Sequence, residues 1–194
     1  FIDDKVGELV QALEASGQAE NTVVVFCADH GEMLGERGMW FKQSFFEWSA
    51  RVPLTVLAPA RYAPRRVSEC VSLVDLLPTL VGIGGGEVKL PCDGESLEAA
   101  LDGRPTRDLV ICDYSGIGPC VPTRMVRQGR YKLMYTHGHP DLLFDLETDP
   151  NELHNLAEDS THAATLKRLK FILMDGWDPE EIDRIIRQGQ AERL

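Results

Sequence analysis

The pattern of apolar and polar positions predicts an amphipathic helix near the start of the chain, over residues 4–16. Val6, Leu9 and Leu13 fall on one side of such a helix, because residues three and four positions apart share a face. Gly17 follows, and glycine is common directly after a helix. A helix of this kind buries its apolar side against another element of the fold.

The segments that follow are predicted to be strands of a sheet that helices cover. Residues 22–28 and 52–58 are short, continuous apolar runs, which are typical of strands buried on both faces. A helix is expected over residues 74–83, with Asp75 at its N-cap, and a loop with one short helix then reaches about Arg107. A helix followed by a buried strand is half of a β-α-β unit, so this part is expected to be α/β, with a mostly parallel sheet.

The second part of the chain has a different pattern. Short β-type runs alternate with turn residues, which predicts a small, partly antiparallel sheet. Two helices close the chain, one over residues 161–174 and one that begins at Asp178-Pro179. We therefore divide the chain into residues 1–108, which are expected to be α/β, and residues 109–194, a small sheet with terminal helices. The runs are residues 109–112, 123–127, 131–135 and 142–145.

Composition and charge restrict the classes of function. The 194 residues, of which 43% are hydrophobic, are enough to bury a core. A net charge of -11 would repel a phosphate backbone, so we expect no nucleic-acid partner. No apolar run is long enough to span a membrane, so no membrane contact is expected, and a homo-oligomer is compatible with the sequence.

The five cysteines indicate a reducing environment. Their number is odd and no CxxC pair occurs, which argues against a disulfide framework and against a zinc site. We therefore expect a cytoplasmic protein. Cys27 lies within the first apolar run, where a small buried side chain is expected rather than a reactive thiol.

Asp29 and His30 directly follow the first predicted strand. In open α/β sheets ligands bind just beyond the carboxyl ends of the strands, and carboxylate and imidazole are both metal-ligand types. Gly31 follows them and allows the backbone to turn sharply. Taken alone, the triplet has a plain alternative, a turn in which Asp29 only caps the backbone.

The residues after this triplet occur in an order that is specific to one family. Gly35 is followed by Gly-Met-Trp-Phe-Lys at 38–42, Phe-Phe-Glu at 45–47 and Arg-Val-Pro-Leu at 51–54. Together with Asp-His-Gly at 29–31, these motifs resemble the type I sulfatases of the alkaline phosphatase superfamily. The residues around them are similar to those of choline-sulfatase-like members. Further matching motifs lie at residues 74–80, 93–97, 127–132 and 143–156.

The resemblance implies a fold, a substrate and site residues. The fold would be the C-terminal part of an alkaline-phosphatase-like α/β sandwich, in which residues 1–108 belong to the catalytic domain and residues 109–194 form a C-terminal subdomain. The substrate would be a small sulfate ester. Asp29 and His30 would hold a divalent metal ion, for which Ca²⁺ is the first expectation in this family, with Mn²⁺ and Mg²⁺ as alternatives because one ligand is nitrogen. Lys42 would be a catalytic residue that binds a sulfate oxygen.

Two further residues are candidates for contact with the substrate. Trp40 either lines the substrate pocket or packs into the core. Asp113, expected just after a strand, either attracts a quaternary ammonium group, as the resemblance suggests, or only caps a turn. Glu47 and Arg51 are expected to form a buried ion pair that shapes the loop.

The resemblance also implies a nucleophile that this chain does not contain. The family uses formylglycine, made from Cys or Ser in a Cys/Ser-x-Pro/Ala-x-Arg motif. The segment from Cys120 to Arg124 has these letters, but it follows Asp29 by a long way instead of preceding it, so we interpret it as coincidence. Formylglycine and the remaining metal ligands are expected in an N-terminal part outside this chain, and the chain alone is expected to be inactive.

Three functions fit these observations. The first is a sulfuric ester hydrolase of which this chain is the C-terminal fragment. The second is a phosphonate or phosphate ester hydrolase on the same scaffold, which uses the same residue types. The third is a non-catalytic structural or assembly module.

Overall fold

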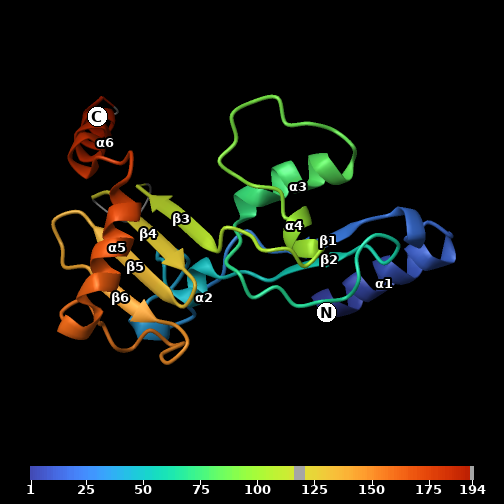
Figure 1. The fold of residues 1–194 in the computed structure, drawn as a ribbon, viewed down its shortest axis with the longest axis horizontal. Helices are drawn as coiled ribbons and strands as arrows, with labels where there is room; N and C mark the ends of the chain where they lie inside the picture. Colours follow the sequence, from blue (N-terminus) through green and yellow to red (C-terminus); the bar gives the residue numbers. More distant parts are fainter. Residues whose placement is uncertain (116–120, 193–194) are drawn as a thin grey trace.

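Two antiparallel sheets with surrounding helices make up the computed structural model, which describes residues 1–115 and 121–192 (Figure 1). The first sheet consists of β1 (Val24–Cys27) and β2 (Leu54–Leu57). The second sheet has four strands in the order β3-β4-β5-β6. Their bounds are β3 (Leu109–Tyr114), β4 (Thr123–Gln128), β5 (Tyr131–Thr136) and β6 (Leu142–Asp145).

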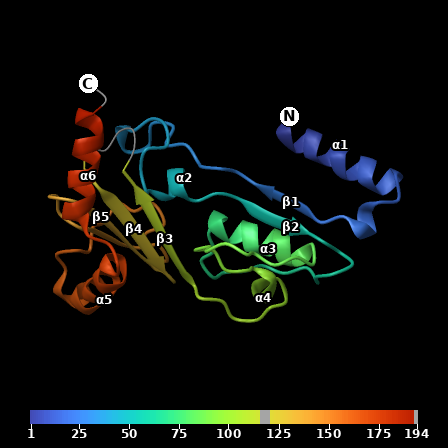
Figure 2. The same cartoon turned by 90° about the horizontal axis from the view of Figure 1, so that it is seen from above.

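The helices occupy distinct places around the two sheets. On one side of the two-stranded sheet lies α1 (Ile2–Ala15), and on the other lie α3 (Leu76–Ile83) and α4 (Glu98–Leu101) (Figure 2). The one-turn helix α2 (Glu47–Ala50) lies between the sheets. At the C-terminal end, α5 (Ala163–Met174) crosses the four-stranded sheet and α6 (Pro179–Ala191) follows. Short 3-10 turns occupy Ala19–Asn21, Glu36–Gly38, Leu73–Asp75 and Ser160–His162. None of the helices in the described part of the chain combines the length and the apolar character that a membrane span requires.

The two-stranded sheet differs from the buried parallel sheet that the sequence predicted for this segment. β1 and β2 pair antiparallel, with Val24 opposite Leu57. The pairing is antiparallel because the chain leaves β1 and returns to the same end of the sheet, without a crossover to the opposite end. Phe26 is 40% exposed and Cys27 is exposed, so the prediction of a buried Cys27 is wrong for this chain.

The four-stranded sheet is antiparallel throughout, and α5 covers one of its faces. Val126 and Leu133 lie opposite each other on β4 and β5, and both are fully buried. Leu169 and Leu173 of α5 pack against them. A leucine of this kind contributes about 2 kcal/mol when it is fully buried, so this contact is a major source of stability for the C-terminal part.

The other face of the same sheet is covered by the segment that leads into α2. Successive side chains of a strand point to opposite faces, so Met125 and Met134, one position away from the α5 side, face this segment. They pack with Phe144 against Phe45 and Phe46. Residues well before the predicted division at 108 therefore belong to the core of the C-terminal sheet.

Candidate functional site

Asp29, His30 and Lys42 meet in the loop that follows β1. The Nζ atom of Lys42 lies 2.7 Å from Nε2 of His30. The Oδ2 atom of Asp29 lies 3.3 Å from the same nitrogen. The metal ligands and the sulfate-binding lysine predicted from the sequence are thus brought to one place.

The backbone next to His30 determines which of its ring nitrogens carries the hydrogen. Nδ1 lies 2.7 Å from the carbonyl oxygen of Gly31. A carbonyl oxygen only accepts hydrogen bonds, so Nδ1 carries the hydrogen and donates it, and Nε2 keeps the lone pair of the neutral ring. Metal-ligating histidines show the same arrangement, in which a backbone carbonyl holds the other ring nitrogen.

The donor atoms present fit part of a divalent metal site. The side chain of Asp29 is 86% exposed, and its Oδ1 accepts the backbone N–H of His30 at 3.0 Å. One carboxylate oxygen and one imidazole nitrogen, Oδ2 of Asp29 and Nε2 of His30, therefore lie on the same side, 3.3 Å apart. Across residues 1–115 and 121–192 no group of three or more His, Cys, Asp or Glu side chains is arranged to hold a metal ion, so the two donors form a partial site.

Ser49 of α2 links the segment that carries His30 to the segment that carries Lys42. Its carbonyl oxygen accepts the backbone N–H of Gly31 at 2.8 Å, and its hydroxyl donates to the carbonyl oxygen of Lys42 at 2.5 Å. Ser49 is only 2% exposed, so water does not compete for either bond. Sequence reasoning missed this residue, because a helix of one turn carries no periodic signal.

The loop between His30 and Lys42 folds back over a buried methionine. Met33 is fully buried, and its backbone N–H donates to the carbonyl oxygen of Phe41 at 2.9 Å. Phe41 has a φ of 68°, a backbone conformation that non-glycine residues rarely adopt. Trp40 is 64% exposed, so it does not pack into the core of this chain.

Asp113 lies within β3, opposite Arg124, although the sequence placed it after the strand. Its Oδ1 is 3.0 Å from Nε of Arg124, and Arg124 also donates to the carbonyl oxygen of Leu173 in α5. The side chain of Asp113 therefore faces α5, whereas the segment that leads into α2 covers the opposite face. Burial raises the pKa of Asp113, although the Arg124 charge lowers it in part.

Glu47 pairs with two cations of the four-stranded sheet, and the predicted ion pair with Arg51 is wrong. Its Oε1 lies 2.7 Å from Nζ of Lys132, and its Oε2 lies 3.1 Å from Nη1 of Arg127. Arg51 is exposed. The partners of Glu47 come instead from β4 and β5, 80 and 85 positions further along the chain.

The structure describes only part of the Cys-x-Pro-x-Arg segment at residues 120–124. Cys120 lies outside the residues that the structure describes. Thr123 and Arg124 belong to β4, as the sequence predicted, whereas the family motif opens a helix.

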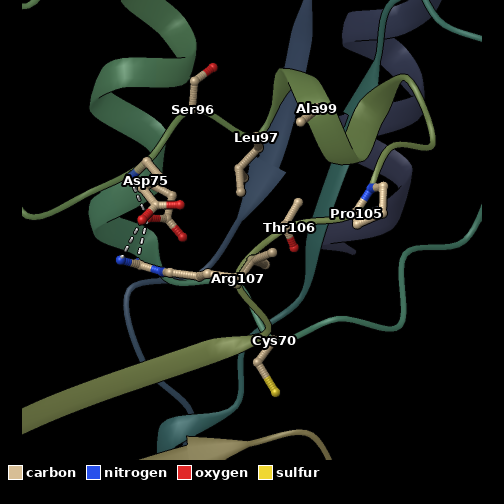
Figure 3. A pocket seen from close by; sticks show the side chains of 10 residues that line it. Cys70, Asp75, Ser96, Leu97, Ala99, Pro105, Thr106 and Arg107 are labelled. Carbon is tan, nitrogen blue, oxygen red and sulfur yellow. Dashed lines mark hydrogen bonds and ion pairs between the residues drawn. The ribbon is translucent and has the colours of Figure 1, made fainter.

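A small hollow of about 100 Å³ lies away from these residues, beside α3 and α4 (Figure 3). Asp75 forms an ion pair with Arg107 at 3.0 Å and accepts backbone hydrogen bonds from Ser72 and Glu95. Cys70 also lines the hollow, and burial raises the pKa of its thiol to about 11. Its lining includes none of the residues predicted to bind metal or sulfate, and the charged groups satisfy one another, so we assign the hollow a structural role.

Comparisons with known proteins show which family the chain resembles. Residues 1–86 match the family model described as Sulfatase. Over its whole length the chain is 40% identical to a choline-sulfatase from Rhizobium meliloti (strain 1021) and spans 39% of that protein. The relatives are thus more than twice as long as this chain.

Solved structures give the same result. A 2-O GAG sulfatase superimposes with a TM-score of 0.80 at 30% identity, over 90% of this chain and 40% of that one. The phosphonate monoester hydrolase of Agrobacterium radiobacter superimposes with a TM-score of 0.73 at 31% identity, over 85% of this chain and 36% of that one. These matches confirm the predicted α/β fold class, and the chain belongs to the sulfatase family.

Proposed function

We propose that this chain supplies part of the active site of a sulfuric ester hydrolase. The observation that carries the proposal is the 2.7 Å contact between Lys42 and His30, which puts a cation beside a metal-type nitrogen donor. Membership of the sulfatase family supports the type of reaction. The longer protein that would contain this chain, called the parent protein below, would supply the formylglycine nucleophile and the remaining metal ligands.

In this proposal Lys42 acts directly on the sulfate group. A fixed ammonium beside a sulfate oxygen stabilises the negative charge that grows as the sulfur–oxygen bond breaks. Asp29 and His30 would hold the divalent ion, which supplies Lewis-acid charge when it is bound. The lone pair of Nε2 serves only one partner, so in this proposal Lys42 gives up its bond to His30 when the metal ion binds and donates to the sulfate instead.

The test is the Lys42→Ala variant of the parent protein. We expect kcat/KM for a sulfate ester to fall by about 10² to 10³, the usual cost of losing one charge-stabilising donor. Lys89→Ala, which removes an exposed lysine from the loop between α3 and α4, is the matched control and should leave the rate unchanged. Full activity of Lys42→Ala, or a parent protein whose mass lacks formylglycine, would contradict the proposal.

As the first substrate we propose choline sulfate. The 40% identity with the Rhizobium meliloti choline-sulfatase supports this choice. Trp40 and Phe41, which are 64% and 66% exposed directly before Lys42, offer aromatic faces that attract a quaternary ammonium group. The neutral isostere 3,3-dimethylbutyl sulfate is the comparison, and Trp40→Leu should lower kcat/KM for choline sulfate roughly tenfold more than for the isostere.

A phosphonate monoester hydrolase is the second candidate. The observation that favours it is the similarity to the enzyme of Agrobacterium radiobacter, whose TM-score is 0.73. The parent protein should be assayed with sulfate and phosphonate esters of the same alcohol. A higher kcat/KM for the phosphonate would replace the first proposal with this one.

A further inference from the structure

Four charged side chains lie together between the four-stranded sheet and α2, and two of them, Lys132 and Glu152, are buried. Lys132 is fully buried, and its Nζ lies 2.7 Å from Oε1 of Glu47 and 2.7 Å from Oε1 of Glu152. Arg127 completes the group at 3.1 Å from Glu47, so two carboxylates balance two cations. A buried charge is costly unless it is paired, so each member of this network holds the others in place.

The network holds α2 by its first residue. The second carboxylate oxygen of Glu152, Oε2, accepts the backbone N–H of Glu47 at 2.7 Å. Glu152 is 1% exposed and has a φ of 56°, a conformation that persists only where the surroundings impose it. Its carbonyl oxygen also accepts a hydrogen bond from Arg37, so the residue is held on both its backbone and its side chain.

From α2 the contacts run directly to the candidate site. Ser49 stands two positions after Glu47 in the same helical turn and binds both Gly31 and Lys42, as described above. The carbonyl oxygen of Trp48 adds a bond from the N–H of Glu32 at 2.8 Å. A displacement of α2 would therefore move the backbone on both sides of the contact between His30 and Lys42.

We propose that Lys132 and Glu152 are positioning residues for this site. By fixing α2, and through it Ser49, they set the distance between the ammonium that binds sulfate and the nitrogen that binds metal. Neither side chain touches the substrate. The inference rests on the proposed function, and it differs from a purely structural role, in which loss of the network lowers stability but leaves the chemistry of each folded molecule unchanged.

The test compares Lys132→Met with Lys170→Met in the parent protein. Lys170 is a matched control, because it forms a 2.6 Å ion pair with Asp141 in the same part of the molecule and is 41% exposed. At a temperature where unfolding curves show both variants folded, kcat of Lys132→Met should fall roughly tenfold or more, with less than about a threefold change in KM. Lys170→Met should keep the kcat of the unmodified protein.

A double-mutant cycle tests the route through α2. If Lys132 acts through Ser49, adding Lys132→Met to Ser49→Ala should lower kcat much less than it does alone, because the two changes remove one shared effect. If the kcat of the double variant instead falls by the product of the two single factors, the route through Ser49 is overturned. An unchanged kcat in folded Lys132→Met would overturn the proposal itself.

Glu152→Gln serves if Lys132→Met does not fold. The amide has nearly the same shape and keeps an oxygen that can accept the N–H of Glu47, while the charge that faces Lys132 is lost. Its kcat should fall in the same direction by a smaller factor, and a full kcat would overturn the proposal. Lys42→Ala in the same series tests the proposed function separately: if it alone inactivates the protein, only the positioning role is wrong.

Discussion

The carbonyl oxygen of Trp48 lies 2.0 Å from the position that a Cβ atom on Gly31 would occupy. Real Cβ atoms essentially never approach another heavy atom within 3.0 Å, so no side chain fits there without a shift of α2. Gly31 does not have a positive φ, unlike Gly35 and Gly38 nearby. The glycine after His30 is therefore required by close packing against α2, and not by the sharp turn that the sequence suggested.

Gly31→Ala should damage both stability and activity. The added methyl group would push α2 away and cost about 1–3 kcal/mol, the usual penalty for overpacking, and it would separate Lys42 from His30. Gly7→Ala is the control, since nothing lies within 4 Å of its Cβ position in α1, and it should raise stability by about 0.5–1 kcal/mol. Chemical unfolding and sulfatase assays of the parent protein measure the two effects. Normal activity in Gly31→Ala would show that α2 can move without harm.

The cysteines should differ in their reactivity toward an alkylating reagent. Cys27 and Cys92 are exposed, whereas burial raises the pKa of Cys70 to about 11 and also raises the pKa of Cys112. Because the thiolate is the reactive form, we expect Cys27 and Cys92 to be modified at least about tenfold faster at pH 7.5. Peptide mapping by mass spectrometry after short exposure to iodoacetamide gives the order. Equal rates for Cys70 and Cys92 would contradict the buried environment of Cys70.

Asp145 should contribute stability that depends on pH. Arg130 donates from Nε to Oδ1 of Asp145 at 2.6 Å and from Nη2 to Oδ2, and this pair lowers the pKa of the Asp145 carboxyl. A carboxyl whose folded pKa is depressed stabilises the fold above its unfolded pKa of about 3.9, and the stability is lost as the pH falls through the folded pKa. Asp145→Asn should thus cost about 1.5 kcal/mol at pH 7, and this difference should shrink below about pH 4.

The control for this titration uses the same arginine. Glu147 lies 2.6 Å from Arg130 but is 66% exposed, so Glu147→Gln should cost less than about 0.5 kcal/mol at any pH. Urea unfolding at several pH values gives both series. A pH-independent difference for Asp145→Asn would show that its charge plays no part.

His30→Asn should change the preference for the metal ion. An amide oxygen in place of the imidazole nitrogen favours Ca²⁺ over Mn²⁺, so the ratio of activities with the two ions should shift toward Ca²⁺ by roughly tenfold. A chelator should abolish the activity of the parent protein, and added ions should restore it. His154→Asn, which alters a histidine whose side chain is 78% exposed, is the control. An unchanged ratio in His30→Asn would remove His30 from the set of ligands.

Local elements could be predicted because they depend on neighbouring residues. The helix expected over residues 4–16 is α1, and the four short runs of the second part are β3 to β6. The direction of β2 relative to β1 is not a local property, since it depends on the path of the chain between the two strands. For the same reason a run of apolar residues indicated a strand but not the exposure of Phe26 and Cys27.

The candidate site was predictable only through the order of the family motifs. No periodicity indicates that Lys42 returns to within 2.7 Å of His30. Glu47 was recognised as a partner in a buried ion pair, but its actual partner, Lys132, stands 85 positions further along the chain. Ser49 carried no recognisable signal, and Glu152 was noted only as part of a matching motif, because their roles arise from contacts between segments far apart in the sequence.

The buried network also determines where two relatives could exchange segments. A hybrid joined at residue 108 would change sequence where the first sheet gives way to the second. Glu47 would then come from one relative, and Lys132, Arg127 and Glu152 from the other. A donor without those cations would leave the Glu47 carboxylate buried and unpaired, at a cost of about 3–5 kcal/mol. A crossover before residue 45 would instead transfer the network whole, together with the aromatic side chains of Phe45 and Phe46 that cover the sheet. Recombinant hybrids of this family should therefore fold more often when the junction precedes α2.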